Sequence, residues 1–157
     1  MVQTLDVNWI WSQFQDLSND QLYQLLKLRQ DVFILEQQCF YPDMDDLDSD
    51  CIHLLGYQNN ELVAYLRLIP AEFHDSGNIA LGRIIAKSTQ RGSGLGKAMM
   101  TEAMDYLQKH FPEQDVQMSA QDHLQKFYNN FGFSSVAEAY DEDGIPHIMM
   151  LYQHSSK

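Results

Sequence analysis

The fold of this chain is decided by Gln90-Arg91-Gly92-Ser93-Gly94-Leu95-Gly96-Lys97. Before this stretch, Ile79 to Ala86 is short, apolar and rich in β-branched residues, which is typical of a buried strand. After it, residues 95–110 repeat apolar side chains at helical spacing. A strand, a glycine loop and a helix in this order place unpaired N–H groups and the positive end of the helix dipole at the loop. The stretch therefore favours a phosphate ligand.

Two well-known phosphate loops do not fit the spacing of these glycines. A Walker A loop has four residues between its glycines and then Lys-Ser/Thr, whereas three separate Gly92 from Gly96, and Ala98 replaces the hydroxyl residue. A dinucleotide loop has Gly-x-Gly-x-x-Gly directly after the strand, but here the pattern is Gly-x-Gly-x-Gly after a five-residue link, 87–91. A glycine-rich connection without a ligand remains an alternative, since short glycine motifs are weak signals.

Length and charge limit the classes of protein to consider. The chain has 157 residues and 45% hydrophobic content, so we expect one domain, 1–157, with a sizeable core. A net charge of −12 with no run of Lys or Arg argues against a nucleic-acid partner. No stretch approaches the roughly 20 apolar residues of a membrane span, so we expect a cytoplasmic protein without a membrane partner. Cys39 and Cys51 are the only cysteines and are expected to be free thiols.

Local patterns predict the remaining elements. Ser18-Asn19-Asp20-Gln21 is a capping-box pattern that starts a helix expected to run from Asn19 to about Glu36. Asn59-Asn60 and Asp141-Glu142-Asp143-Gly144 are hairpin signals. The other predicted elements are strands at 7–14, 52–57, 62–69, 116–120, 136–140 and 147–152 and a helix at 124–131. This order predicts an α/β fold, with a mixed central sheet and helices on both faces.

Two motifs in this order resemble those of the GNAT family of acyl-CoA-dependent N-acetyltransferases. Arg91, Gly94 and Gly96 occupy the family's Gln/Arg-x-x-Gly-x-Gly/Ala pattern, and residues 125–133 resemble its Phe-Tyr-x-x-x-Gly-Phe element. The resemblance covers nearly the whole chain. Within the family, residues 32–39 and 143–148 resemble the bacterial ElaA branch.

The resemblance implies acetyl-CoA as the acyl donor and a primary amine as the acceptor. It places the CoA pyrophosphate on the loop residues Arg91, Gly92, Ser93, Gly94, Leu95, Gly96 and Lys97. It places the pantetheine arm along the backbone of Ile84, Ile85 and Ala86. Tyr128 matches the tyrosine whose hydroxyl reaches the CoA sulfur and assists the departing thiolate; its alternative role is packing beside Phe127. The resemblance also makes a homodimer one candidate assembly.

The general base has more than one candidate. An alkylamine has a pKa near 10.4 and is almost fully protonated at neutral pH, so a base or a water relay must remove a proton. Glu36 follows the predicted first helix, and His147 begins the last predicted strand. Each has a structural alternative: Glu36 as a surface carboxylate and His147 as a hydrogen-bonded turn residue. His53 is a third candidate, more typical of a hydrogen-bonded strand histidine.

Five aspartates, at positions 43, 45, 46, 48 and 50, concentrate negative charge after the first helix. Their spacing does not fit a calcium loop, which needs Gly at its sixth position and Glu at its twelfth, so no metal is predicted. Two interpretations remain: a solvated loop, or a rim that attracts a cationic acceptor, a small molecule or a peptide. Two alternatives to an enzyme also remain: a CoA-binding regulatory module without turnover, and a structural domain without a ligand.

Overall fold

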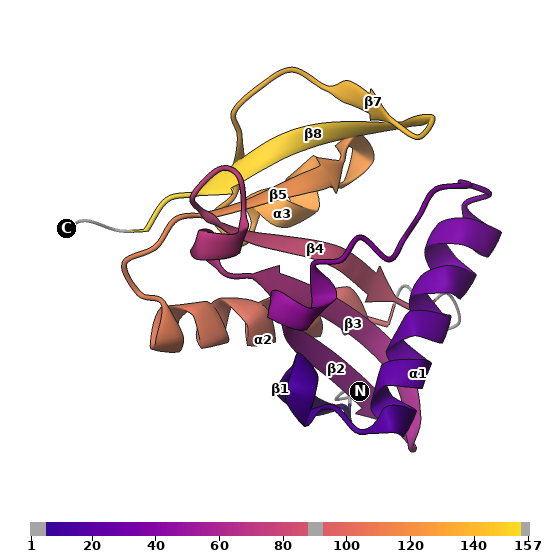
Figure 1. The fold of residues 1–157 in the computed structure, drawn as a ribbon. Coiled ribbons are helices and arrows are strands. Elements are labelled where there is room, and N and C mark those ends of the chain that lie inside the picture. Colours follow the sequence, from indigo (N-terminus) through magenta and orange to yellow (C-terminus); the bar gives the residue numbers. More distant parts are fainter. Residues whose placement is uncertain (1–5, 88–92, 155–157) are drawn as a thin grey trace.

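The computed structural model describes residues 6–87 and 93–154 (Figure 1). Their strands form one eight-stranded sheet in the order β1-β2-β3-β4-β5-β8-β6, with β7 also paired to β8. The strands are β1 (Asn8–Gln13), β2 (Ile52–Gln58), β3 (Glu61–Ile69), β4 (Ile79–Ala86), β5 (Val116–Gln121), β6 (Ser134–Ser135), β7 (Tyr140–Glu142) and β8 (Ile145–Tyr152). The helices are α1 (Asn19–Arg29), η2 (Gln30–Glu36), α2 (Leu95–His110) and α3 (Gln125–Asn129). Short 3₁₀ turns are η1 (Phe14–Asp16), η3 (Asp48–Asp50), η4 (Ala71–Phe73) and η6 (Asp122–Leu124).

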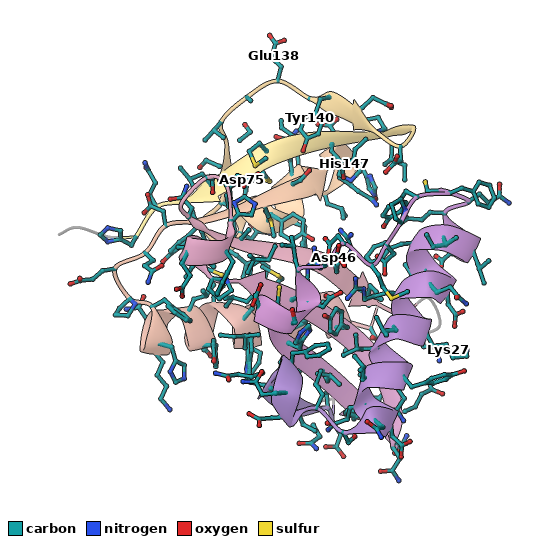
Figure 2. The ribbon with its side chains drawn as sticks, viewed as in Figure 1. Lys27, Asp46, Asp75, Glu138, Tyr140 and His147 are labelled. Atoms are coloured by element: carbon teal, nitrogen blue, oxygen red, sulfur yellow. The ribbon has the colours of Figure 1, made fainter. Side chains whose placement is uncertain are left out.

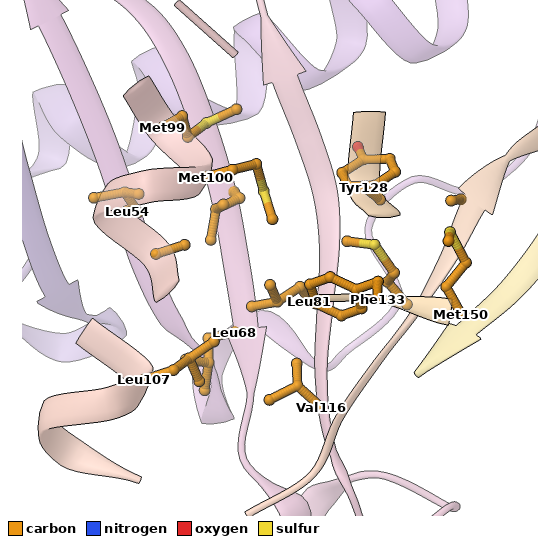
Figure 3. Packing of buried hydrophobic residues seen from close by; sticks show 14 of the residues in the cluster. Leu54, Leu68, Leu81, Met99, Met100, Leu107, Val116, Tyr128, Phe133 and Met150 are labelled. Atoms are coloured by element: carbon orange, nitrogen blue, oxygen red, sulfur yellow. The ribbon is translucent and has the colours of Figure 1, made fainter. Parts of the chain in front are cut away.

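Helices cover both faces of this mixed sheet, as the sequence predicts. Neighbours in a strand point to opposite faces, and this alternation separates two cores. On one face, α2 and α3 contribute Met99, Leu107 and Tyr128 to the larger core (Figure 3). On the other face, Leu25 and Leu28 of α1 pack in a second core. Within the described ranges, no helix has the length and apolarity that a bilayer crossing requires.

The predicted caps and turns are confirmed. Ser18 Oγ accepts from the Gln21 backbone N–H at 3.0 Å, and Gln21 Oε1 accepts from the Ser18 N–H at 2.9 Å, which completes the capping box. Asn59 and Asn60 both have positive φ, 52° and 64°, between β2 and β3. Asp143 and Gly144, between β7 and β8, also have positive φ, 52° and 84°. Two successive residues of positive φ match the twist of a two-residue hairpin.

Two predicted elements differ most from the structure. From Gln30 to Glu36 the first helix widens into a π-helix, with the Gln37 N–H donating to the Val32 carbonyl at 3.1 Å. Residues 136–139 are not a strand, although 136–140 was predicted as one. Val136 makes one backbone bond to Met149, and its side chain is 56% exposed, so this segment has no packed face to hold a longer ladder.

The parallel pairing of β4 with β5 ends early. Their register contains Ile79–Val116 and Ala80–Gln117, and beyond these pairs the two strands diverge (Figure 1). β4 also carries a bulge against β3, where Arg83 has a φ of 50°. The bulge lies in the part of β4 that is not paired with β5, and the β4 residues of this part line a cavity.

Candidate active site

A cavity of about 710 Å³ lies where β4 and β5 separate. Residues 82–86 of β4 form one wall and residues 118–121 of β5 form the other. Side chains of η2 and of the β7–β8 hairpin also line it. Gly96, Met99 and Met100 of α2 and Phe127 and Tyr128 of α3 complete the lining from the other face of the sheet. The cavity thus runs between the two helical layers.

The glycine loop enters helix α2 at the edge of this cavity. Arg91 and Gly92 lie outside the described residues, so their predicted contacts stay predictions. Gly94 is the N-cap of α2 with a φ of 88°, a conformation that glycine adopts without strain. The first turn contains no acidic residue, so the positive end of the helix dipole is not neutralised there.

The other predicted loop residues occupy different positions. Ser93 is exposed. Gly96 lines the cavity. Leu95 is 2% exposed and belongs to the core, so its contribution to a ligand would be its backbone N–H. The Lys97 side chain is exposed.

Ile84, Ile85 and Ala86 all line the cavity at the diverging end of β4. Ile85 is 2% exposed and packs in the core beneath α1, whereas Ile84 packs against the core on the α2 side. Their side chains therefore stabilise the fold on both faces. Their backbones lie along the wall where the resemblance places the pantetheine arm.

Tyr128 belongs to the larger hydrophobic core and also borders the cavity. Its ring is 5% exposed and meets Phe127 edge-on, with the ring centroids 5.1 Å apart. It also lines the cavity. Burial raises the pKa of Tyr128 to about 12, so its hydroxyl stays protonated at neutral pH. Within residues 6–87 and 93–154, no group hydrogen-bonds to that hydroxyl, which leaves its proton available to a ligand.

Glu36 and His147 both line the cavity. Glu36 is the last residue of the π-helix and is exposed to solvent. His147 is 8% exposed; its Nδ1 lies 2.8 Å from the Ile145 carbonyl, and its Nε2 lies 3.3 Å from Glu142 Oε2. Tyr140 and His147 are register partners on the β7–β8 hairpin (Figure 2). Both nitrogens of His147 therefore already face acceptor oxygens.

His53 is a structural histidine. It is fully buried in β2, with Nδ1 2.6 Å from the Tyr65 hydroxyl and Nε2 2.9 Å from the Asp48 carbonyl. A carbonyl can only accept, so Nε2 carries the proton and Nδ1 accepts from Tyr65. Burial lowers the pKa of His53 and favours this neutral form. The residue is not part of the cavity lining.

Both interpretations of the aspartate cluster need correction. Asp43, Asp45 and Asp48 are ion-paired with three arginines of α1, β3 and β4. The three arginines are Arg29, Arg67 and Arg83. The charges of these three aspartates are thus balanced within the protein, and they are neither a solvated loop nor a free rim for a cation. Asp46 and Asp50 are exposed.

Several residues that line the cavity were not predicted as site residues from the sequence. Glu142 and Asp143 were recognised as part of a hairpin turn, yet both line the cavity. Cys39, a free thiol as predicted, donates to the Asp143 carbonyl at 3.3 Å and joins the loop after η2 to that hairpin. Further unpredicted lining residues are Tyr41, Arg83, Ser119, Gln121 and His123. Alternation along β5 could have indicated Ser119 and Gln121 as one polar face, but not which cavity they line.

Comparison with known proteins shows the family. A model of the acetyltransferase (GNAT) domain matches residues 15–153. The chain belongs to the GNAT family. It is 43% identical over 146 residues to the protein ElaA of Escherichia coli, covering 92% of this chain and 95% of that protein.

Two solved GNAT structures have the same fold. The crystal structure of Escherichia coli ElaA superposes with a TM-score of 0.87 at 40% identity, covering 94% of this chain and all of that one, 100%. The crystal structure of an acyl-CoA N-acyltransferase from Pseudomonas aeruginosa superposes with a TM-score of 0.87 at 39% identity, covering 92% of this chain and 99% of that one. The predicted family, its ElaA branch and the α/β GNAT fold are thereby confirmed. GNAT membership supports an acyltransferase activity.

Proposed function

We propose that the protein transfers an acetyl group from acetyl-CoA to a primary amine within one ternary complex. The observation that carries this proposal is the cavity between the diverging strands β4 and β5. It is lined by residues at the beginning of α2, by residues 82–86 of β4, by Tyr128 and by the acidic residues Glu36, Glu142 and Asp143. Direct transfer needs donor and acceptor in one space with the reacting atoms in line, and this cavity provides such a space.

The donor would occupy the part of the cavity next to α2. Gly94 and Gly96 let a pyrophosphate approach the first-turn N–H groups, where the dipole is favourable. The backbone of Ile84 to Ala86 would hold the pantetheine arm, which leads the thioester toward Tyr128. Tyr128 would then donate a hydrogen bond to the departing thiolate.

The acceptor would occupy the part next to η2 and the β7–β8 hairpin. Glu36, Glu142 and Asp143 bring carboxylates to the cavity lining there. Arg83 also lines it, but its charge is balanced by Asp43 at 2.8 Å. An excess of negative charge in a partly enclosed site favours a cationic acceptor, a small molecule or a peptide. This preference rests on the acidic cavity lining, because Asp43, Asp45 and Asp48 of the loop after η2 are paired with arginines.

Glu36 is our first choice for receiving the amine proton. Both ring nitrogens of His147 face acceptor oxygens, so His147 could accept a proton only after Glu142 moves away from Nε2. Glu36 lies at the end of η2 and lines the acceptor part of the cavity. His147 remains the second candidate, and a water relay the third.

The test is turnover of acetyl-CoA with a panel of diamines, polyamines, basic peptides, neutral amines and acidic amino acids. Free CoA and the acetylated product are both quantified, and cationic amines should give the highest kcat/KM. Asp143→Asn should raise KM for a cationic amine, because it removes one charge from the lining while Asn tolerates the positive φ of this position. Glu138→Gln removes the same charge from an exposed side chain that points away from the body of the protein (Figure 2) and is the matched control.

Each outcome of the panel has a definite meaning. Binding of acetyl-CoA without any acetylated product would support the regulatory-module alternative and overturn the proposed enzyme. A best substrate that is neutral or anionic, or equal effects of the two variants, would overturn the cationic acceptor while leaving acetyl transfer in place.

A further inference from the structure

The bulge in β4 holds a residue in a conformation that its side chain does not favour. Between the pairs Tyr65–Ile85 and Arg67–Gly82, β3 advances two residues while β4 advances three. Arg83 and Ile84 therefore lie opposite the single residue Leu66, and Arg83 has a φ of 50°, in the left-handed region that residues with a Cβ rarely adopt. Something outside the strand must therefore hold this backbone in place.

Asp43 supplies that restraint. Its Oδ1 accepts from Arg83 Nε at 2.8 Å, and its carbonyl accepts from Arg83 Nη2 at 3.0 Å. The ring of Tyr41 lies 5.7 Å from the same guanidinium. These contacts cross 40 residues of sequence, from the loop after η2 to the bulge.

The same aspartate is anchored to helix α1. Its Oδ2 accepts from Arg29 Nε at 2.9 Å, and its carbonyl also accepts from Arg29 Nη2 at 3.0 Å. Arg29 is fully buried and is fixed in turn by Asp48, whose Oδ1 lies 2.7 Å from Nη1. Each carboxylate oxygen of Asp43 therefore holds a different arginine, and the bulge is tied to α1 through one side chain.

The linked elements line different parts of the cavity. Arg83 and its neighbours Gly82 and Ile84 belong to the β4 wall, while Cys39 and Tyr41 line the cavity from the loop that contains Asp43. A shift of Asp43 would change both the direction of the β4 backbone and the distance between these two parts. Bulges often re-aim the backbone beside an active site.

We propose that Asp43 is a positioning residue for acyl transfer, which acts by holding the Arg83 bulge and thereby the β4 backbone that faces the thioester. The proposal rests on the proposed function and adds a residue that touches neither substrate. The amide of Asn has one acceptor oxygen in place of two, so its side chain can keep the Nε contact to Arg29 or to Arg83 but not both, while the backbone carbonyl still accepts from the Nη2 atoms of the two arginines. Asp43→Asn should therefore loosen the bulge while Asp48 still holds Arg29.

The first measurement is independent of turnover. Acetyl-CoA labelled with carbon-13 at the acetyl carbonyl is bound to the full-length protein, and the carbonyl chemical shift is compared with that in solution. The parent should show a shifted resonance, and Asp43→Asn should bring it toward the solution value while the Kd of acetyl-CoA changes less than about threefold. An unchanged shift in a folded Asp43→Asn protein would overturn the proposal.

Kinetics separate positioning from general stability. Asp43→Asn should lower kcat by about 10- to 100-fold, as small misplacements of reacting groups do, with little change in the KM of acetyl-CoA. Asp46→Asn is the control, because Asp46 is an exposed neighbour whose φ of 65° suits Asn, and it should keep the parent kcat. Equal kcat for both variants would refute a positioning role. Absence of turnover in the parent itself would instead refute the proposed function, and the carbonyl shift would still decide on Asp43.

A second pair of variants covers the case in which Asp43→Asn does not fold. Arg83→Ala keeps the strained φ without the guanidinium, whereas Arg83→Gly removes the strain as well. If Arg83 serves to hold the bulge, the Gly variant should retain at least about tenfold more activity than the Ala variant. Equal activity of the two variants would mean that Arg83 contacts a substrate directly, and would overturn the proposal.

Discussion

Replacing Tyr128 by Phe separates a catalytic hydroxyl from a packed ring. The ring is 5% exposed and remains in Phe, with its edge-on contact to Phe127 at 5.1 Å. Within the described part of the chain, the hydroxyl has no hydrogen-bond partner that the substitution would leave unpaired. We therefore expect the free energy of unfolding to change by less than about 0.5 kcal/mol.

The expected effect on rate follows from the pKa of Tyr128. A thiol has a pKa of about 8.5, whereas burial raises the pKa of Tyr128 to about 12, so full proton transfer to the thiolate is uphill by roughly 5 kcal/mol. A hydrogen bond to the developing thiolate needs no such transfer and contributes about 1.5–3 kcal/mol. Tyr128→Phe should therefore lower kcat about 10- to 100-fold, with little change in the affinity for CoA.

The assay combines CoA release with urea denaturation of the same preparations. Tyr106→Phe is the matched control, because Tyr106 stacks on Trp11 with ring centroids 3.8 Å apart and does not line the cavity. Pre-steady-state kinetics must show that chemistry limits kcat. If chemistry is limiting and Tyr128→Phe turns over at the rate of the parent, the hydroxyl takes no part in the reaction.

Three further predictions test the donor site, the ion pairs and the base. Gly94→Glu should weaken acetyl-CoA binding at least about tenfold, because it places a carboxylate at the N-terminus of α2. The control is Gly77→Glu, at a position with a similar positive φ and open space around it, which should leave binding unchanged. Equal binding by both variants would contradict the pyrophosphate site. Burial raises the pKa of Asp45, but the hydrogen bonds and the positive charge of Arg67 outweigh burial and lower this pKa from 3.8 to about 2. The folded state therefore binds fewer protons than the unfolded state, and the protein loses stability as the pH falls from about 4 to 2. Asp45→Asn should lower the free energy of unfolding by about 2 kcal/mol at pH 7 and flatten this acid limb in urea titrations, and an unchanged limb argues against the ion pair. Glu36→Gln should lower kcat/KM about 100-fold and His147→Asn less, measured across pH; if both variants keep the parent's rate and pH profile, a water relay removes the proton.

Sequence-based prediction succeeded where neighbouring residues determine the conformation. The capping box needs Ser18 and Gln21 three positions apart, and the β2–β3 turn needs two residues that tolerate positive φ, supplied by Asn59 and Asn60. Such local patterns, read in order along the chain, indicated an α/β fold with a mixed sheet, and two motifs among them resembled those of the GNAT family. The resemblance singled out Tyr128, and the search for a general base singled out Glu36 and His147; all three line one cavity.

The charge of the aspartate loop could not be interpreted in this way. Asp43 finds its partners 14 and 40 residues away, on a helix and on a strand bulge, and no periodicity in the sequence links these positions. The sequence shows five aspartates within the eight residues 43–50. Only the folded structure shows that Arg29, Arg67 and Arg83 form ion pairs with three of these aspartates. The sequence did not predict that Glu142 and Asp143 line the cavity. A turn sequence specifies the conformation of its own backbone, but not which cavity lies beside it.

The amino-acid sequence by itself thus determined the order of elements, the caps, the turns and the glycine entry to α2, because each depends on interactions within a few residues. Tertiary structure decided the separation of β4 from β5, the strained φ of Arg83 and the pairing of its charge. These features arise from side chains that meet across the sheet, and their energies depend on burial and on distances that exist only after the chain has folded.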